Sequence, residues 1–283
     1  MKTRLSLLMV SFVFLTGFSG SGHDVVKIIT ASSYTTEVWK YKSRGSSEKD
    51  IGIVFLHGKR GDPSVDHNRK FIDKMRDEGF VVAAPIMPWS EKRGYEGTRG
   101  QGLEVIDEAV KLLDKSRVVV IGHSMGGMAV LQYGARGVPS NVIGLVSVAP
   151  GHDPNNSGKI RSLTESAAET ACVTMKAGKG ADKGQYPEVN AGKKYSIDAS
   201  AEYYCTYYSV NEYPDSLQIA GENTTPTFIL SGTQDRLTQG YSHEDIFFSL
   251  PESNLNQHEI LTGKHKSVLF NNVDAITRWI EKL

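Results

Sequence analysis

The sequence has little cysteine, no excess of charge of either sign and no apolar run long enough to span a bilayer comfortably. Its 283 residues carry 32 basic and 32 acidic side chains, so the formal net charge is zero and no affinity for nucleic acid is indicated. Neither of the 2 cysteines has a metal-type CxxC neighbour, so zinc is not indicated. A hydrophobic fraction of 39% is ordinary for a globular chain, which excludes a disordered or polytopic membrane protein.

The longest apolar run lies at the N-terminus. A basic start, MKTR, is followed by the apolar stretch LSLLMVSFVFLTGF and the small-residue stretch SGSG, which is the order of a secretory signal. We predict a signal peptide over residues 1–22 and export to the periplasm or beyond, with membrane contact only through this segment. The run is shorter than the roughly 20 residues that span a bilayer. An uncleaved N-terminal anchor is the alternative.

Export changes the interpretation of Cys172 and Cys205. In an oxidising compartment the two could pair and close a loop, which by chain entropy contributes about 3–4 kcal/mol. Two buried free thiols are the alternative that the sequence leaves open.

Beyond the signal, strand and helix patterns alternate. Residues 25–30 and 36–43 are rich in β-branched and aromatic side chains and predict an antiparallel edge. Residues 51–58, IGIVFLHG, are typical of a strand buried on both faces of a parallel sheet. The later alternation indicates βαβ units. We therefore predict one α/β domain, residues 23–283, with a mostly parallel, doubly wound sheet and no internal repeats.

The alternation stops between Pro150 and Thr225. This segment holds both cysteines, a Lys- and Gly-rich run and the aromatic run AEYYCTYYSVNEY. A loop of this length inside a compact domain is usually a lid or a binding element. We expect a lid-like insertion at residues 151–225, after the sixth predicted strand. Its tyrosines would form either a wall of the lid or its packing face.

The stretch VVVIGHSMGGM, residues 118–128, runs from a buried strand pattern into a helix pattern. Ser124 lies between the two in a Gly-x-Ser-x-Gly motif. Glycines on both sides permit a tight, strained turn that projects the serine hydroxyl clear of the backbone, as a nucleophile requires. A helix N-cap serine with glycines for close packing is the alternative.

Four motifs together resemble the α/β-hydrolase superfamily: FLHG, GHSMGG, SGTQD and GKHKS. The resemblance covers nearly all of the chain after the signal, and the order of nucleophile, acid and histidine is the family order. It implies that His265, before the last helix, is the base and that Asp235 orients it. Asp153 is the rival acid, and a surface loop histidine is the alternative interpretation of His265.

The resemblance also implies an oxyanion hole, formed by the backbone N–H groups of Lys59 and Met125. In the family a histidine at the position of His57 supports this loop. The candidate pocket residues are His57, Trp89, Arg93 and Tyr95.

The run HGKRG puts two cations, Lys59 and Arg60, beside the site. With Arg93 they predict a preference for acidic or polar acyl groups, and a solvated loop is the alternative.

The expected function is therefore hydrolysis of a small-molecule carboxylic ester by a Ser-His-Asp triad through an acyl-enzyme. No metal or organic cofactor is required. A peptidase, amidase or thioesterase on the same triad is the alternative within this chemistry, and a non-catalytic binding protein on the hydrolase scaffold is the alternative outside it. The sequence gives no indication of oligomeric state.

Overall fold

The computed structural model describes residues 14–18, 22–190, 192–237 and 242–283. Within these residues the centre of the fold is a nine-stranded sheet in the order β1-β2-β3-β5-β4-β6-β7-β10-β11. Its strands are β1 (Phe14–Phe18), β2 (His23–Ile29), β3 (Thr35–Tyr41), β4 (Ile51–Leu56), β5 (Val81–Pro85), β6 (Arg117–His123), β7 (Val142–Val148), β10 (Thr227–Gly232) and β11 (Gln257–Leu261).

The sheet is antiparallel at one edge and parallel elsewhere. β1, β2, β3 and β5 pair antiparallel in turn, and every pairing from β5 to β11 is parallel. All residues of β4 and β5 are buried, because their apolar runs have helices on both faces. The predicted antiparallel edge and the mostly parallel, doubly wound sheet are confirmed.

The predicted signal peptide, residues 1–22, falls largely outside the described residues and stays a prediction. The part of it that is described includes β1, which pairs with β2 at the edge of the sheet. No helix in the described part of the chain is long and apolar enough to cross a membrane.

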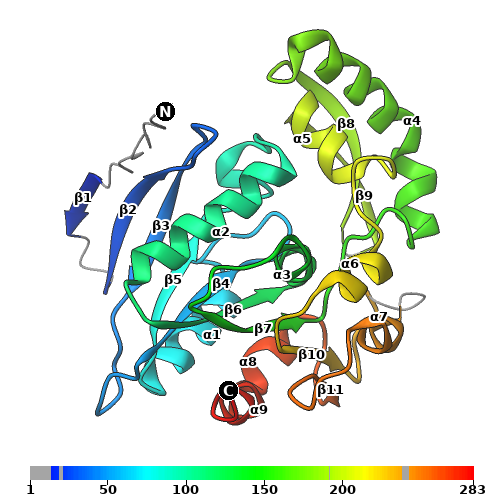
Figure 1. Cartoon of the computed structure of the whole chain (residues 1–283). Helices are drawn as coiled ribbons and strands as arrows, with labels where there is room; N and C mark the ends of the chain where they lie inside the picture. The colour runs from blue at the N-terminus through cyan, green and yellow to red at the C-terminus, as the bar shows by residue number, and fades with distance from the viewer. Residues whose placement is uncertain (1–13, 19–21, 191, 238–241) are drawn as a thin grey trace, which may run out of the picture.

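Helices cover both faces of the sheet (Figure 1). One face carries α1, α8 and α9, and the other carries α2 and α3, with α6 packed on α3 and α7 on α6. These helices are α1 (Asp66–Asp77), α2 (Arg99–Leu113), α3 (Met125–Arg136), α6 (Ser216–Glu222), α7 (His243–Ser249), α8 (Ser267–Asn271) and α9 (Val273–Ile280), with a short 3₁₀ turn at Glu91–Arg93. The helical segment at the C-terminus is divided at Asn272 into α8 and α9.

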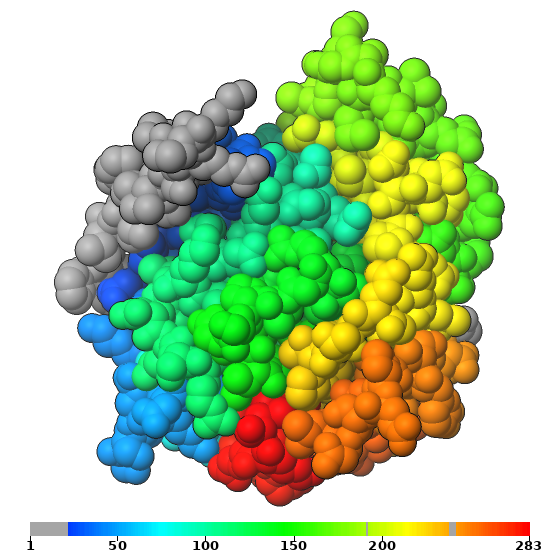
Figure 2. Space-filling view, viewed as in Figure 1, coloured from blue at the N-terminus to red at the C-terminus, as the bar shows by residue number. Residues whose placement is uncertain are grey.

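Residues 158–190 and 192–208 form a separate lobe, which we call the cap; the other described residues are the body. The cap rises from the body in Figure 1, and the space-filling view shows its light green and yellow surface standing out (Figure 2). Its elements are α4 (Gly158–Thr174), a π-helical turn (Met175–Lys179), β8 (Lys183–Asn190), β9 (Lys193–Ser200) and α5 (Ala201–Tyr208). The insertion expected at residues 151–225 is thus divided, because α6 packs on α3 as part of the body.

The cap is held together by a disulfide and by stacked tyrosines. The bond between Cys172 and Cys205 joins α4 to α5, so the pairing that the sequence left open is present. The ring of Tyr204 stacks on those of Tyr186 and Tyr208, with centroids 4.3 and 4.4 Å apart. The tyrosine run is therefore the packing face of the cap.

Candidate active site

Ser124 lies on a strained turn at the carboxyl end of β6. Its φ of 57° and ψ of −119° fall in a region that L-residues rarely adopt, and α3 begins at the next residue. Such strain persists only where the surrounding structure fixes it. The strand–turn–helix expected from the sequence is present, and the side chain of Ser124 is partly exposed.

Two glycines beside Ser124 are needed because backbone lies against them. A Cβ on Gly122 would lie 2.1 Å from the carbonyl oxygen of Gly126, and a Cβ on Gly126 would lie 2.4 Å from that of Leu56. A side chain on Gly122 would collide with the first turn of α3, and one on Gly126 would collide with the end of β4. The glycines therefore fix the serine against the centre of the sheet.

His265 and Asp235 meet at the carboxyl edge of the same sheet. Asp235 follows β10, His265 lies between β11 and α8, and Nδ1 of His265 lies 2.7 Å from Oδ2 of Asp235. The other carboxylate oxygen accepts a hydrogen bond from the N–H of Leu237 at 2.9 Å. Burial raises the pKa of Asp235, but the hydrogen bond and positive charge of His265 outweigh burial and leave that pKa below its usual value. An ionised Asp235 makes Nδ1 the donor and leaves Nε2 as the basic nitrogen.

The rival acid, Asp153, is engaged elsewhere. Its Oδ1 accepts from the backbone N–H groups of Asn155 and Asn156, and its Oδ2 accepts from the side chain of Asn156. Asp153 closes the turn that leads into the cap and makes no hydrogen bond to His265.

His123, next to Ser124 in the sequence, contacts His265 instead. Its Nε2 donates to the backbone carbonyl of His265 at 2.8 Å, and the two rings lie 4.9 Å apart. Burial holds the pKa of His123 well below its usual value, so the ring stays neutral. Sequence reasoning missed this role, although the position beside Ser124 at the end of a central strand was the available signal.

The loop after β4 lies directly against Ser124. A Cβ on Gly58 would lie 3.1 Å from Cβ of Ser124, and Lys59 and Met125 line the same hollow as Ser124. Neither backbone N–H, of Lys59 or of Met125, donates to another described residue. Two N–H donors beside a serine hydroxyl are the arrangement that stabilises an oxyanion.

Hydrogen bonds of His57 stabilise the loop after β4 on the side away from the hollow. Its Nδ1 donates to the carbonyl of Gly58 at 2.8 Å, and its Nε2 accepts from the N–H of Met87 at 3.0 Å. The indole N–H of Trp89 donates to the His57 carbonyl at 2.9 Å. Burial lowers the pKa of His57 to about 4, which keeps the ring in the neutral form that this pattern requires.

The four predicted pocket residues do not line either hollow that contains Ser124, so that prediction is wrong. His57 and Trp89 are buried behind the loop. Tyr95 is buried against Tyr203 of the cap, and Arg93 binds the hydroxyl of Tyr34 at 3.1 Å. The aromatic side chains after β5 fill the boundary between body and cap instead of facing substrate.

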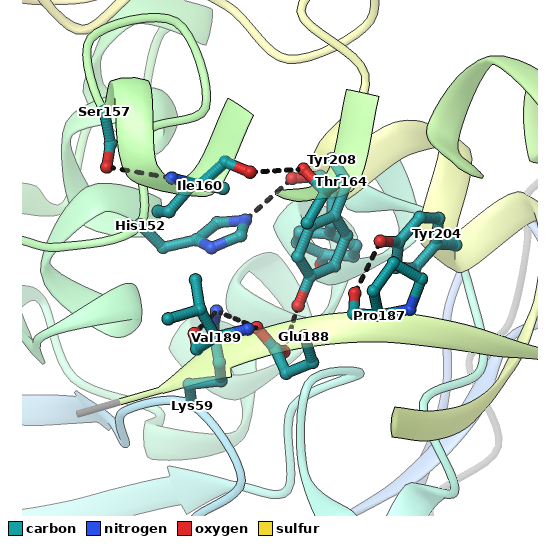
Figure 3. A network of polar contacts seen from close by, with 11 residues as sticks. Lys59, His152, Ser157, Ile160, Thr164, Pro187, Glu188, Val189, Tyr204 and Tyr208 are labelled. Carbon is teal, nitrogen blue, oxygen red and sulfur yellow. Dashed lines mark hydrogen bonds and ion pairs between the residues drawn. The ribbon is translucent and has the colours of Figure 1, made fainter. Parts of the chain in front are cut away.

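Two of the three cations expected to attract substrate are paired with carboxylates, and the third, Arg93, binds Tyr34 away from the hollows. Lys59 Nζ lies 2.9 Å from Oε1 of Glu188 in β8, and both side chains are buried (Figure 3). The hydroxyl of Tyr208 and the N–H of Val189 also donate to the Glu188 carboxylate. Arg60 pairs with Glu91. The expected preference for acidic groups therefore does not arise from Lys59, Arg60 or Arg93.

Two hollows meet at Ser124 and His265. The first, of about 220 Å³, lies between body and cap and includes His152, Lys159, Val189 and Arg236. The second, of about 430 Å³, lies toward α1 and includes His67, His123 and Lys266. His152, Lys159 and Arg236 were not predicted, because the sequence does not show how the cap folds over the body. Within the described residues no cluster of side chains suited to a metal ion is present.

Comparison with known proteins agrees with this architecture. The sequence pattern of the serine aminopeptidase family S33 matches residues 103–271. No curated protein sequence matches the chain significantly.

Solved structures match the chain over most of its length. DcsB in complex with a substrate analogue has a TM-score of 0.70 at 15% identity, covering 92% of this chain and 98% of that one. The α/β-hydrolase GrgF from Penicillium sp. sh18 has a TM-score of 0.66 at 17% identity, covering 90% and 95%. The esterase Pf2001 from Pyrococcus furiosus has a TM-score of 0.63 at 17% identity, covering 95% and 97%. At these identities the similarity establishes a shared fold.

Proposed function

Because the chain belongs to the serine aminopeptidase S33 family of α/β-hydrolases, we propose that it is a serine hydrolase that cleaves carboxylic esters with Ser124, His265 and Asp235. The observation that carries the proposal is the 2.7 Å contact between His265 and Asp235 at the mouth of a hollow that also contains Ser124 on its strained turn. The fold is also that of an esterase, Pf2001.

Each side chain has one role in the proposed reaction. The Ser124 oxygen attacks the acyl carbon while Nε2 of His265 takes its proton, and Asp235 holds the imidazole in the required tautomer. The carbonyl oxygen becomes an oxyanion beside the N–H groups of Lys59 and Met125. His265 then gives its proton to the departing alcohol. Water attacks the acyl-enzyme with His265 as base, which releases the acid and restores the serine.

Amide cleavage at a free amino terminus is a second candidate, since the family is described as aminopeptidases. Recognition of an α-ammonium group calls for a carboxylate beside the nucleophile. Among the described residues neither hollow at Ser124 is lined by Asp or Glu, and Glu188 behind them already binds Lys59. The surroundings of Ser124 therefore favour ester over aminopeptidase substrates.

Export remains part of the proposal. A disulfide is typical of the oxidising compartments to which a signal peptide leads, so the bond between Cys172 and Cys205 supports it. The N-terminus of the mature protein should then follow residue 22, which N-terminal sequencing of protein from the native cell would establish.

A fluorophosphonate probe and short-chain p-nitrophenyl esters test the activity. We expect the folded protein to label, and Ser124→Ala or His265→Ala to lower kcat/KM by a factor on the order of 10³ or more. Ser253→Ala, an exposed serine in a loop, is the matched control and should retain full activity. Labelling of Ser124→Ala equal to that of the wild type would exclude the proposed nucleophile. Faster cleavage of leucine p-nitroanilide than of the esters would favour the aminopeptidase.

A further inference from the structure

The hollow between body and cap is small and polar. Its volume of about 220 Å³ is below the usual range of roughly 300–1,000 Å³ for small-molecule sites, so it suits one compact group beside the acyl carbon. Ser124, Met125 and His265 lie at its body side, and Lys159 and Val189 lie at its cap side. A substrate bound to Ser124 therefore has one end enclosed by the cap.

Unpaired positive charge surrounds this hollow. Lys159 and Arg236 line it, no described Asp or Glu lines it, and neither cation forms an ion pair with a described carboxylate. Lys266, on the adjoining hollow, is also without such a pair. Lys59 differs, because Glu188 neutralises it. Inside a cleft, positive side chains without paired carboxylates raise the local concentration of anions.

The amino end of α4 adds to this charge. α4 has 17 residues, and its N-cap Ser157 and first-turn residues Lys159 and Ile160 line the hollow. The amino end of a helix carries a partial positive charge that favours anions within its first turn.

His152 provides a separate indication that a polar ligand fills the hollow. Its side chain is 9% exposed, and Nε2 donates to the carbonyl of Tyr207 at 2.7 Å. That bond leaves Nδ1 as an acceptor, and it is buried without a partner among the described residues. Figure 3 shows the ring close to Ile160 and Val189, which line the hollow with it. A buried acceptor without a partner is costly, so a hydroxyl or N–H of the ligand is expected to donate to it.

We propose that the acyl group of the substrate bears an oxyanion, a carboxylate or a phosphate-type group, that binds between Lys159 and Arg236 at the amino end of α4, with a neighbouring hydroxyl or N–H on His152. The proposal rests on the proposed ester hydrolysis, since it names the class of ester. It assigns Lys159 of the cap and Arg236 of the body to substrate selection, apart from the residues proposed for acyl transfer.

Matched esters test the proposal. We expect 4-methylumbelliferyl hydrogen glutarate to be cleaved with a kcat/KM at least about tenfold above that of the neutral pentanoate, a difference of about 1.4 kcal/mol. Lys159→Gln or Arg236→Gln should each lower this ratio several-fold, by raising KM for the glutarate ester more than KM for the pentanoate. Lys176→Gln, which removes an exposed charge elsewhere on the cap, is the matched control. A phosphonate-terminated ester of the same length distinguishes the two kinds of oxyanion.

The outcomes separate this proposal from the function on which it rests. Equal kcat/KM values for the glutarate and pentanoate esters in the wild type would overturn the anion site while ester hydrolysis stands. The same conclusion would follow if Lys159→Gln and Arg236→Gln kept the glutarate-to-pentanoate ratio of the control Lys176→Gln. If neither ester is cleaved, ester hydrolysis fails, and calorimetry of free glutarate decides the site. Binding that Lys159→Gln weakens would support the site, and no binding by the wild type would overturn it.

A hydroxylated substrate tests the assignment of His152. The 3-hydroxyglutarate ester should be preferred over the glutarate ester by the wild type, and His152→Leu should abolish that preference. A preference for the hydroxyl that survives in His152→Leu would exclude His152 as its partner.

Discussion

The body and the cap are stabilised by different interactions. In the body, two apolar layers cover a sheet whose central strands are fully buried, and the proposed triad lies at the carboxyl ends of those strands. The cap has an antiparallel pair of strands, a disulfide and stacked tyrosines, and a buried ion pair joins it to the body. The body thus positions reacting groups by backbone packing, whereas the cap is held by a few specific contacts.

This difference explains how one fold can keep its chemistry and change its substrate. The turn at Ser124 is fixed by two glycines that lie against other backbone, and neither glycine position has room for a side chain. The side chains proposed to select substrate, Lys159 and Arg236, lie on the cap and on a loop and are exposed. Replacing them changes charge in the hollow without disturbing the sheet. Four experiments test how independent the two regions are.

The largest effect is expected from breaking the ion pair between body and cap. Glu188→Ala leaves the buried charge of Lys59 without a carboxylate and should lower the free energy of unfolding by about 3–5 kcal/mol. Urea denaturation measures the loss. Glu91→Ala breaks the exposed pair with Arg60 and should cost less than about 1 kcal/mol. Equal losses in the two variants would show that burial of the Lys59–Glu188 pair does not matter.

Removing the disulfide should loosen the cap alone. The bond closes a loop with a sequence separation of 33, and chain entropy predicts a loss of about 3–4 kcal/mol for the double variant Cys172→Ser/Cys205→Ser. Hydrogen exchange should speed up in residues 158–208 and stay slow in the sheet strands. Reduced wild-type protein is the control and should match the variant. Faster exchange throughout the sheet would mean that body and cap unfold together.

Acid should weaken the support of the loop after β4. Burial lowers the pKa of His57 to about 4 from an ordinary value near 6.5, so protonation favours the unfolded chain. The stabilisation is complete above pH 6.5 and is lost as the pH falls toward 4, by about 2–3 kcal/mol at pH 4.5. Urea denaturation at pH 7 and pH 4.5 should show a smaller difference in His57→Gln. His258→Gln, at a half-buried ring, should change the difference less.

The smallest effect is expected from His123, which acts through His265. Removing its hydrogen bond to the His265 carbonyl in His123→Ala should lower kcat roughly tenfold and change KM little, because small displacements of a catalytic base reduce rates. His123→Gln, which keeps a donor, should recover part of the rate. A loss in KM with kcat unchanged would place His123 in substrate binding instead.

The proposed triad could be located from the sequence because the turn at Ser124 follows a local pattern and because the resemblance to α/β-hydrolases implied Asp235 and His265. The pattern at Ser124 encodes its own turn, and the order of elements places Asp235 and His265 at the same edge of a parallel sheet. The antiparallel edge and the buried central strands followed from residue patterns in the same way.

The surroundings of the site could not be predicted, because they depend on contacts between distant segments. Glu188 is buried only because Lys59, 129 residues earlier, lies beneath β8. Trp89 and Tyr95 belong to a segment with the composition of an exposed loop, yet both side chains are buried beneath the cap. The positions of His152, Lys159 and Arg236 depend on how the cap meets the body, and no local pattern encodes that arrangement.

The ion pair between Lys59 and Glu188 also limits how far the cap can move relative to the body. Lys59 belongs to the loop that lies against Ser124. A cap that moved away from the body would therefore either separate the buried ion pair or pull this loop away from Ser124. We therefore expect the cap to stay in place during turnover and substrate to enter through the open sides of the hollows. Ester hydrolysis should then show no lag before steady state and no interfacial activation on micelles. The reason is that the cap does not have to open before the first ester is cleaved.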